Sequence, residues 1–128
     1  MPHLEMSHSS NLGDYLDIGR LCAKANTVMC SLPIFEVGGI RVRAESRTHY
    51  AIADCDPRNA FLDAVLRIGT GRSESEKRDA GDAIFGVLLE FTEPLLNEPY
   101  FALSLEIREI DPVFSWKKNS IHARLRNS

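Results

Sequence analysis

The sequence lacks the features that mark several large classes of protein. No run of apolar residues approaches the roughly 18 that a membrane span needs, and the first eleven residues have no apolar stretch typical of a signal peptide. Basic residues are not in excess, because 15 lysines and arginines face 18 acidic residues, for a net charge of −3. Binding to nucleic acid or to a membrane surface needs a basic face, so we expect neither partner.

Cysteine and histidine are sparse and poorly spaced for metal binding. The three cysteines cannot all pair with one another and show no C-x-x-C spacing, so we expect reduced thiols in a cytoplasmic protein. The four histidines have no histidine four residues away and no cysteine at ligand spacing, so we expect no metal site. These residues are Cys22, Cys30, Cys55, His3, His8, His49 and His122.

Motifs of phosphate binding and of nucleophilic hydrolysis are also missing. The segment Gly69–Ser73 has two glycines but not the longer glycine spacing or the Lys-Ser/Thr ending of a phosphate loop. No G-x-S-x-G segment is present, and no Ser-His-Asp or Cys-His arrangement can be assembled. The sequence therefore gives no support to a nucleotide-binding or hydrolytic site.

Alternation of apolar and polar residues predicts four β-strands. We expect them at His3–Ser7, Ile40–Ala44, Ala60–Ile68 and 103–108, with a further short strand or hairpin arm at 50–53. The polar residues between the first strand and the first helix read as a loop.

Apolar residues at spacings of three and four predict two helices. The first covers about 17–32. The second follows a capping box formed by Ser73 and Glu76 and is expected to kink or end at Pro94, because proline lacks a backbone N–H and its ring crowds the preceding turn. Residues 97–99 should stop it in any case.

The two halves of the chain, roughly 1–56 and 57–110, repeat the order strand, helix, strand. Parallel strands joined through a helix form a βαβ unit. We therefore expect a single domain, residues 1–128, of the α/β (α+β) class, a duplicated βαβ fold with a four-stranded sheet and two helices on one face. The open face would carry some apolar residues and so favours association with other copies. In the C-terminal tail, 111–128, the candidate docking points are Trp116, Ile121 and Leu125.

Few residues stand out as candidates for catalysis or for binding a substrate. Removal of Met1 would leave Pro2 with a free secondary amine, and burial would lower the pKa of that amine from its usual value of about 8. A base near neutrality can shuttle protons between carbon atoms. Arg41 and Arg43 share one face of a strand and Arg72 precedes a helix, so these three could hold a substrate with two or more carboxylates. The alternative is that Pro2 is only a stiff first residue and that the arginines are solvated.

Six short segments spread over nearly the whole chain carry a family resemblance: 1–4, 10–12, 39–43, 68–73, 102–107 and 118–123. With these segments in this order, the sequence resembles the 5-carboxymethyl-2-hydroxymuconate isomerase family. That family belongs to the tautomerase superfamily, which also contains 4-oxalocrotonate tautomerase.

The resemblance implies a homotrimer of double βαβ subunits that acts as an isomerase, a keto–enol tautomerase, without metal or organic cofactor. The reaction it implies is ketonisation of a dienol di- or tricarboxylate by 1,3- or 1,5-proton transfer, in the breakdown of the aromatic compound homoprotocatechuate. Carried over to this sequence, Pro2 would be the catalytic base and acid. Arg41 and Arg72 would hold carboxylates and polarise the 2-oxo group, and Arg43 is a weaker candidate because it could equally make a structural ion pair.

Two alternatives stay open at this stage. The same proton transfer could act on a smaller 2-oxo acid, or the chain could be a non-catalytic trimer that binds an anionic small molecule. The chemical state of the chain end separates them, because Pro2 is a non-basic amide nitrogen as long as Met1 is attached.

Overall fold

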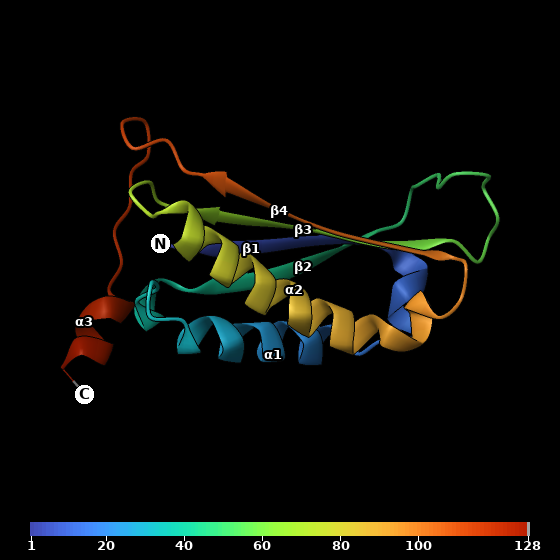
Figure 1. Cartoon of the computed structure of the whole chain (residues 1–128), viewed down its shortest axis with the longest axis horizontal. Helices are drawn as coiled ribbons and strands as arrows, with labels where there is room; N and C mark the ends of the chain where they lie inside the picture. The colour runs from blue at the N-terminus through green and yellow to red at the C-terminus, as the bar shows by residue number, and fades with distance from the viewer. Residues whose placement is uncertain (128) are drawn as a thin grey trace.

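The computed structural model describes residues 1–127. The chain forms a four-stranded sheet in the order β2-β1-β3-β4, and the two long helices lie side by side on one of its faces (Figure 1). Along the chain the elements are β1 (His3–Ser9), η1 (Ser10–Asp14), α1 (Ile18–Ser31), η2 (Val37–Gly39), β2 (Arg41–Arg47), β3 (Ala60–Ile68), α2 (Glu74–Leu96), β4 (Phe101–Glu109) and α3 (Ile121–Arg126).

The sheet consists of two βαβ units. β1 and β2 pair in parallel and are connected through α1, and β3 and β4 pair in parallel and are connected through α2. The two units meet where β1 and β3 run antiparallel in the centre of the sheet. This arrangement confirms the predicted fold class, including the placement of both helices on one face.

The core lies between the sheet and the two long helices. Leu4 of β1 and Leu66 of β3 are direct neighbours across the central strand pair, and both are fully buried. Burying one such leucine is worth about 1.5–3 kcal/mol, so the alternation read from the sequence fixes which face of each strand turns inward. Other large side chains in this fully buried group are Leu12, Leu21, Met29, Leu62, Ile68, Ile84 and Leu88.

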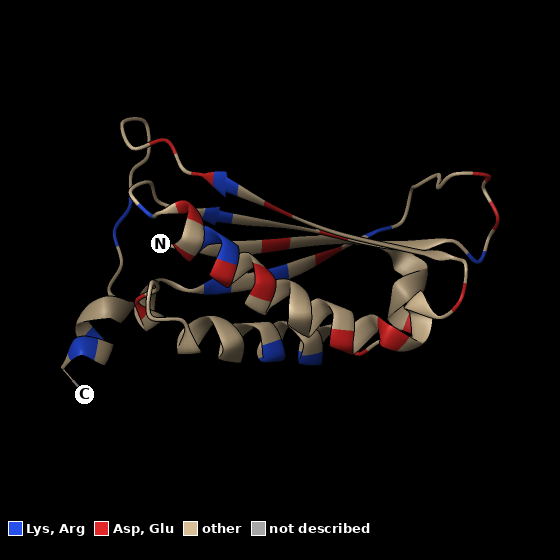
Figure 2. Ribbon diagram, in the orientation of Figure 1, with Lys and Arg blue, Asp and Glu red and all other residues tan. Residues whose placement is uncertain are grey.

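Among residues 1–127, no helix covers the opposite face of the sheet. Charged residues recur along the strands (Figure 2), and several of them form pairs on this face. Glu5 in the central strand β1 contacts arginines on both neighbouring strands, Arg43 and Arg67. Asp63 of β3 accepts a hydrogen bond from the Ser104 hydroxyl at 2.6 Å. The predicted open face is therefore present, but polar pairs occupy more of it than apolar residues do.

Helix α2 begins as the sequence predicts and ends later than Pro94. The Ser73 hydroxyl accepts the Glu76 N–H at 3.1 Å and the Glu76 carboxylate accepts the Ser73 N–H at 2.9 Å, which completes the capping box. The helix continues past Pro94 to Leu96. Pro94 lies in the last turn of the helix, so its missing N–H removes only one backbone hydrogen bond close to the C-terminal end. The helix can therefore continue for two more residues.

Several short predictions differ from the structure. Strand β1 extends to Ser9 and strand β2 to Arg47, because the two pair in register as far as these residues. Residues 10–14 form the short helix η1 instead of a loop. The strand or hairpin arm predicted at 50–53 is wrong: residues 50–52 have no regular structure, and Ala53, at φ 52°, begins a turn. The Asn59 side chain holds this segment by hydrogen bonds to the Ile52 carbonyl and to Asp54.

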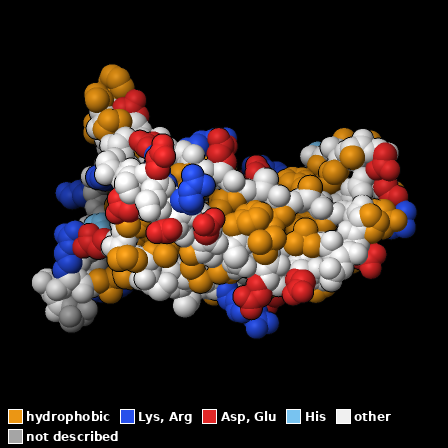
Figure 3. All heavy atoms as spheres, in the orientation of Figure 1, with side chains coloured by type: hydrophobic (Ala, Val, Ile, Leu, Met, Phe, Trp, Pro, Cys, Tyr) orange, Lys and Arg blue, Asp and Glu red, His pale blue; other side chains and the backbone are white. Residues whose placement is uncertain are grey.

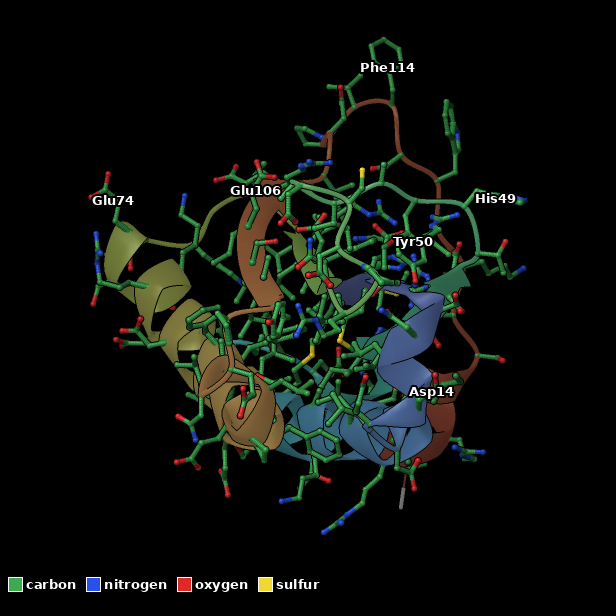
Figure 4. The ribbon with its side chains drawn as sticks, turned by 90° about the vertical axis from the view of Figure 1, so that its right-hand side faces the viewer. Asp14, His49, Tyr50, Glu74, Glu106 and Phe114 are labelled. Carbon is green, nitrogen blue, oxygen red and sulfur yellow. The ribbon has the colours of Figure 1, made fainter. Side chains whose placement is uncertain are left out.

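The C-terminal tail contains the helix α3, which the sequence analysis did not predict. The loop between β4 and α3 projects from the molecule, and Figure 4 shows Phe114 at its tip pointing away from the other elements. Trp116, a predicted docking point, is 86% exposed and does not dock on its own chain. Among residues 1–127, no helix combines the length and the apolar character needed to cross a bilayer.

Candidate active site

The pairing of β1 with β2 fixes the position of the chain end. Pro2 is buried just before β1, and its carbonyl oxygen accepts the backbone N–H of Arg41 at 3.1 Å. His3 is then the direct neighbour of Arg41 in the strand register, and Glu5 is the neighbour of Arg43. The side chains of His3, Glu5 and the two arginines therefore project from one face of the sheet, next to the N-terminus.

Pro2 lines a cavity of about 480 Å³, which we call the proline cavity. Arg72, from the loop between β3 and α2, lines the same cavity. The structure thus brings together two residues that the sequence analysis selected from positions 70 residues apart. The other lining residues are Met1, Ile34, Glu36, Gly39, Lys117, Asn119, His122, Ala123 and Arg126.

Arg41 lines a neighbouring cavity of about 620 Å³, which we call the outer cavity. His3 and Arg67 lie beside it, and the segment after β4 forms the opposite wall. Met1 and Lys117 line both cavities, so the two spaces adjoin at these residues. The predicted arginines Arg41 and Arg72 are therefore on two sides of the chain end.

Arg72 is held in place by backbone carbonyl groups. Its Nη1 donates to the Gly69 carbonyl and its Nη2 to the Ile34 carbonyl, each at 3.0 Å. Its guanidinium carbon lies 5.5 Å from the centre of the Phe35 ring. Gly71, at φ +98°, takes the backbone conformation that this tight loop requires. A guanidinium has five N–H groups, so Arg72 keeps donors for a ligand after making these two bonds.

His3 contacts two arginines and is neutral at pH 7. Burial, followed by the positive charges of Arg41, Arg67 and Arg43, lowers the pKa of His3 to about 4, although Glu5 opposes the shift. The His3 Nε2 lies 2.9 Å from Nη2 of Arg41, and its Nδ1 lies 3.2 Å from Nη1 of Arg43. A neutral imidazole has only one acceptor nitrogen, so His3 accepts a hydrogen bond from one arginine at a time.

Arg43 forms an ion pair with Glu5 and lines neither the proline cavity nor the outer cavity. Glu5 also accepts a bond from Arg67 Nε at 3.1 Å. Burial alone would raise the pKa of Glu5, but hydrogen bonds from Arg67 and Arg43 outweigh it and hold that pKa below its ordinary value. The structure therefore gives Arg43 the structural contact that the sequence analysis offered as its alternative.

Met1 lies where the two cavities adjoin. Its sulfur is 3.2 Å from Nδ2 of Asn119. Burial, and then the positive charges of Lys117, Arg72 and Arg41, lower the pKa of the Met1 amine. The surroundings of the chain end thus favour a neutral amine, which is the form that can accept a proton.

Helix α3 covers one side of the proline cavity. Asn119 donates to the Gly38 carbonyl at 2.8 Å, and the Arg126 guanidinium forms an ion pair with Glu36. His122 lies so close to Gly38 that a Cβ on this glycine would be 2.8 Å from His122 Nδ1. Within residues 1–127 that Nδ1 has no hydrogen bond, although Glu36 Oε2 is 3.3 Å away. In the sequence, the 118–123 segment carries part of the family resemblance and contains the candidate docking point Ile121, but none of its residues was predicted to line the site.

Two further features lie outside this group of residues. A hollow of about 830 Å³ lies between α1 and α2 and contains none of the predicted site residues. Within residues 1–127, no group of three or more His, Cys, Asp or Glu side chains is arranged to hold a metal ion.

Known proteins of one family match the chain over nearly its whole length. The model of the 5-carboxymethyl-2-hydroxymuconate isomerase family matches residues 2–125. The 5-carboxymethyl-2-hydroxymuconate Delta-isomerase of Escherichia coli is 32% identical over 123 residues, which are 96% of this chain and 98% of that protein. The crystal structure of a 5-carboxymethyl-2-hydroxymuconate isomerase from Deinococcus radiodurans R1 superimposes with a TM-score of 0.92 at 43% identity, covering 98% of this chain and 94% of that one.

A more distant structure shares the fold. A fused 4-OT, a wild-type symmetric trimer, superimposes with a TM-score of 0.64 at 12% identity and covers 91% of this chain and 93% of that one. At this identity the likeness extends to the double βαβ fold alone.

Proposed function

The chain belongs to the 5-carboxymethyl-2-hydroxymuconate isomerase family and is an isomerase, and we propose that it ketonises the dienol 5-carboxymethyl-2-hydroxymuconate by a cofactor-free proton transfer through Pro2. The observation that carries the proposal is the shared cavity of Pro2 and Arg72, with Arg41 in the adjoining one. This substrate would give the enzyme a role in the degradation of homoprotocatechuate.

Pro2 would act as the base after removal of Met1. The released proline has a secondary amine in surroundings that already lower the pKa of the Met1 amine through burial and three positive charges. The same causes would act on the Pro2 amine and would leave a useful fraction of it unprotonated near pH 7.

The arginines would bind and polarise the substrate. Arg72, fixed by two carbonyl groups, has remaining N–H donors for a carboxylate at the proline cavity. Arg41, in the outer cavity, would hold the group at the other end of the conjugated chain. Negative charge that develops on the 2-oxygen during the reaction would be stabilised by these fixed cations. Arg43 would support the site by holding Glu5.

Pro2 alone would carry the proton through the whole reaction. The Pro2 nitrogen takes the proton of the 2-hydroxyl group, and the electron pair left behind forms the 2-oxo group. The double bonds shift along the chain, and a distal carbon takes a proton from the prolinium nitrogen. Pro2 is then a free base again, so no other reactant is consumed.

We propose a homotrimer as the working assembly. β4 is an edge strand, and its helix-side residues Phe101, Leu103, Leu105 and Ile107 are only half-buried. Figure 3, which views the molecule from the side of the helices, shows hydrophobic side chains gathered across the middle of that side. An apolar edge of this kind favours contact with another subunit. Light scattering of the purified protein tests this proposal, and a monomer at assay concentration would contradict it.

The test of the catalytic proposal combines mass spectrometry with an ultraviolet assay of dienol ketonisation. The mature chain should begin at Pro2, and Pro2→Ala should lower kcat by about 10²- to 10⁴-fold, the usual contribution of a positioned acid–base group. Pro57→Ala, in the turn between β2 and β3, is the matched control and should keep the wild-type rate. A chain with free Pro2 whose rate is unchanged by Pro2→Ala would refute the proton-transfer role.

A further inference from the structure

We propose that Lys117 is a further substrate-binding residue, which selects substrates with a third carboxylate. This inference rests on the proposed function, because it names the group that would bind the carboxymethyl arm of the dienol. The arm distinguishes a tricarboxylate from a plain muconate, which has a carboxylate only at each end.

Lys117 stands at the junction of the two cavities. It lies in the segment between β4 and α3 and lines both the proline cavity and the outer cavity. Arg72 lines only the first of these and Arg41 only the second. A dienol that reaches from Arg72 to Arg41 must pass the chain end between them, so a side arm on the dienol would face Lys117.

The segment that carries Lys117 is tied to the body of the chain. Two residues further on, the Asn119 side chain donates to the Gly38 carbonyl at 2.8 Å, and its oxygen accepts the Ile121 N–H at 2.7 Å. The ion pair of Arg126 with Glu36 fixes the far end of α3. These contacts hold the backbone near Lys117 in place, while its flexible side chain keeps freedom to follow a ligand.

The charge of Lys117 is available for a ligand. Within residues 1–127, Lys117 has no carboxylate within ion-pair distance. By contrast, Arg72 already donates hydrogen bonds to two carbonyl groups, and Arg41 already contacts the His3 ring. Lys117 lines the same cavity as Pro2, and its charge comes first among the cations that lower the pKa of the Met1 amine.

The chemistry of a lysine suits a carboxymethyl arm. Arginine offers a rigid planar fork, which matches the fixed carboxylates at the ends of a conjugated chain. The arm is joined through a single bond and can rotate, so a point charge on a flexible stem can meet its carboxylate in several orientations. With three cations, the site then offers one partner for each of the three carboxylates.

The experiment compares two substrates with two variants. Lys117→Met keeps most of the length and removes the charge, and Lys24→Met removes a charge from α1, away from both cavities. With 5-carboxymethyl-2-hydroxymuconate, Lys117→Met should lower kcat/KM by about 10- to 100-fold, mainly through KM, as expected for one lost charge-assisted bond. With 2-hydroxymuconate, which lacks the arm, the same variant should stay within about twofold of wild type. Lys24→Met should match wild type with both substrates.

The outcomes separate this inference from the proposed function. If wild type ketonises the tricarboxylate but Lys117→Met loses nothing, or loses equally on both substrates, the role of Lys117 is refuted and the proposed function stands. If wild type ketonises neither dienol, the proposed function fails. Calorimetric binding of propane-1,2,3-tricarboxylate and of glutarate then decides on Lys117: a selective loss of tricarboxylate binding in Lys117→Met supports it, and equal binding overturns it.

Discussion

The carbonyl oxygen of Pro2 accepts the backbone N–H of Arg41 at 3.1 Å. This bond begins the parallel pairing of β1 with β2 and joins the chain end to the strand that carries Arg41, the proposed carboxylate-binding residue. The position of the proposed base is therefore set by backbone pairing, so substitutions of the Arg41 side chain can test binding without displacing Pro2.

Replacement of Arg41 by alanine should weaken substrate binding and leave the fold intact. The lost interaction is a charge-assisted contact with a carboxylate, so kcat/KM should fall by about 10- to 100-fold. Steady-state kinetics and a thermal melt of the variant measure the two effects. Arg78→Ala on the exposed part of α2 serves as the control for loss of one positive charge. Equal kinetics of the two variants would exclude Arg41 from the site.

Loss of the contact between Arg126 and Glu36 should loosen α3. Hydrogen bonds from Arg126 come first among the causes that hold the pKa of Glu36 below its ordinary value. A carboxylate with a lowered pKa supports the folded contact above its ordinary pKa and loses that support as the pH falls through its own lowered pKa. Arg126→Gln should therefore speed hydrogen exchange in 121–126 at neutral pH and raise KM. Unchanged exchange would show that other contacts hold α3.

The neutral state of His3 should make the folded protein sensitive to mild acid. Its pKa is about 4 in the folded chain and near 6.5 without these surroundings. The unfolded chain therefore takes up a proton first as the pH falls, so the contribution of His3 to stability is present above about 6.5 and declines between 6.5 and 4. Denaturant melts at pH 7 and pH 5 should show a smaller loss for His3→Gln than for wild type. Equal losses would contradict the lowered pKa.

The core pair of β1 and β3 should dominate the stability of the sheet. Leu66 is fully buried opposite Leu4, so Leu66→Ala should lower the free energy of unfolding by about 2–5 kcal/mol. Leu89, which is 41% exposed on α2, provides the control, and Leu89→Ala should have a much smaller effect. Chemical denaturation measures both, and similar losses would mean that the assigned core is wrong.

The fold was largely predictable because local patterns and long-range packing agree. Apolar alternation in β3 gave its bounds, Ala60–Ile68, and the capping box of Ser73 with Glu76 gave the start of α2. The small helix α3 was missed because six residues, with only Ile121 and Leu125 as large apolar positions, are too few to establish a helical period. Its position depends on Glu36, which is 90 residues from Arg126 in the sequence.

The candidate site was predictable in its residue types and less so in its geometry. The sequence placed Arg41 and Arg43 on the same face of one strand, but it could not show which of them pairs with Glu5. The parallel register decides this, because it puts Glu5 beside Arg43 and leaves Arg41 beside His3. Lys117 had no signal in its local sequence, since only the folded chain brings it to the N-terminus.

The central claim is that the Pro2 nitrogen is a free amine with a lowered pKa, so that a useful fraction of it is unprotonated near neutral pH. A ¹⁵N NMR titration of the proline nitrogen in the mature protein tests it most directly. The account predicts a chain that begins at Pro2 and a pKa below the ordinary value of about 8 for a chain-end amine. A retained Met1, which makes the nitrogen an amide, or a pKa at or above that value would contradict it.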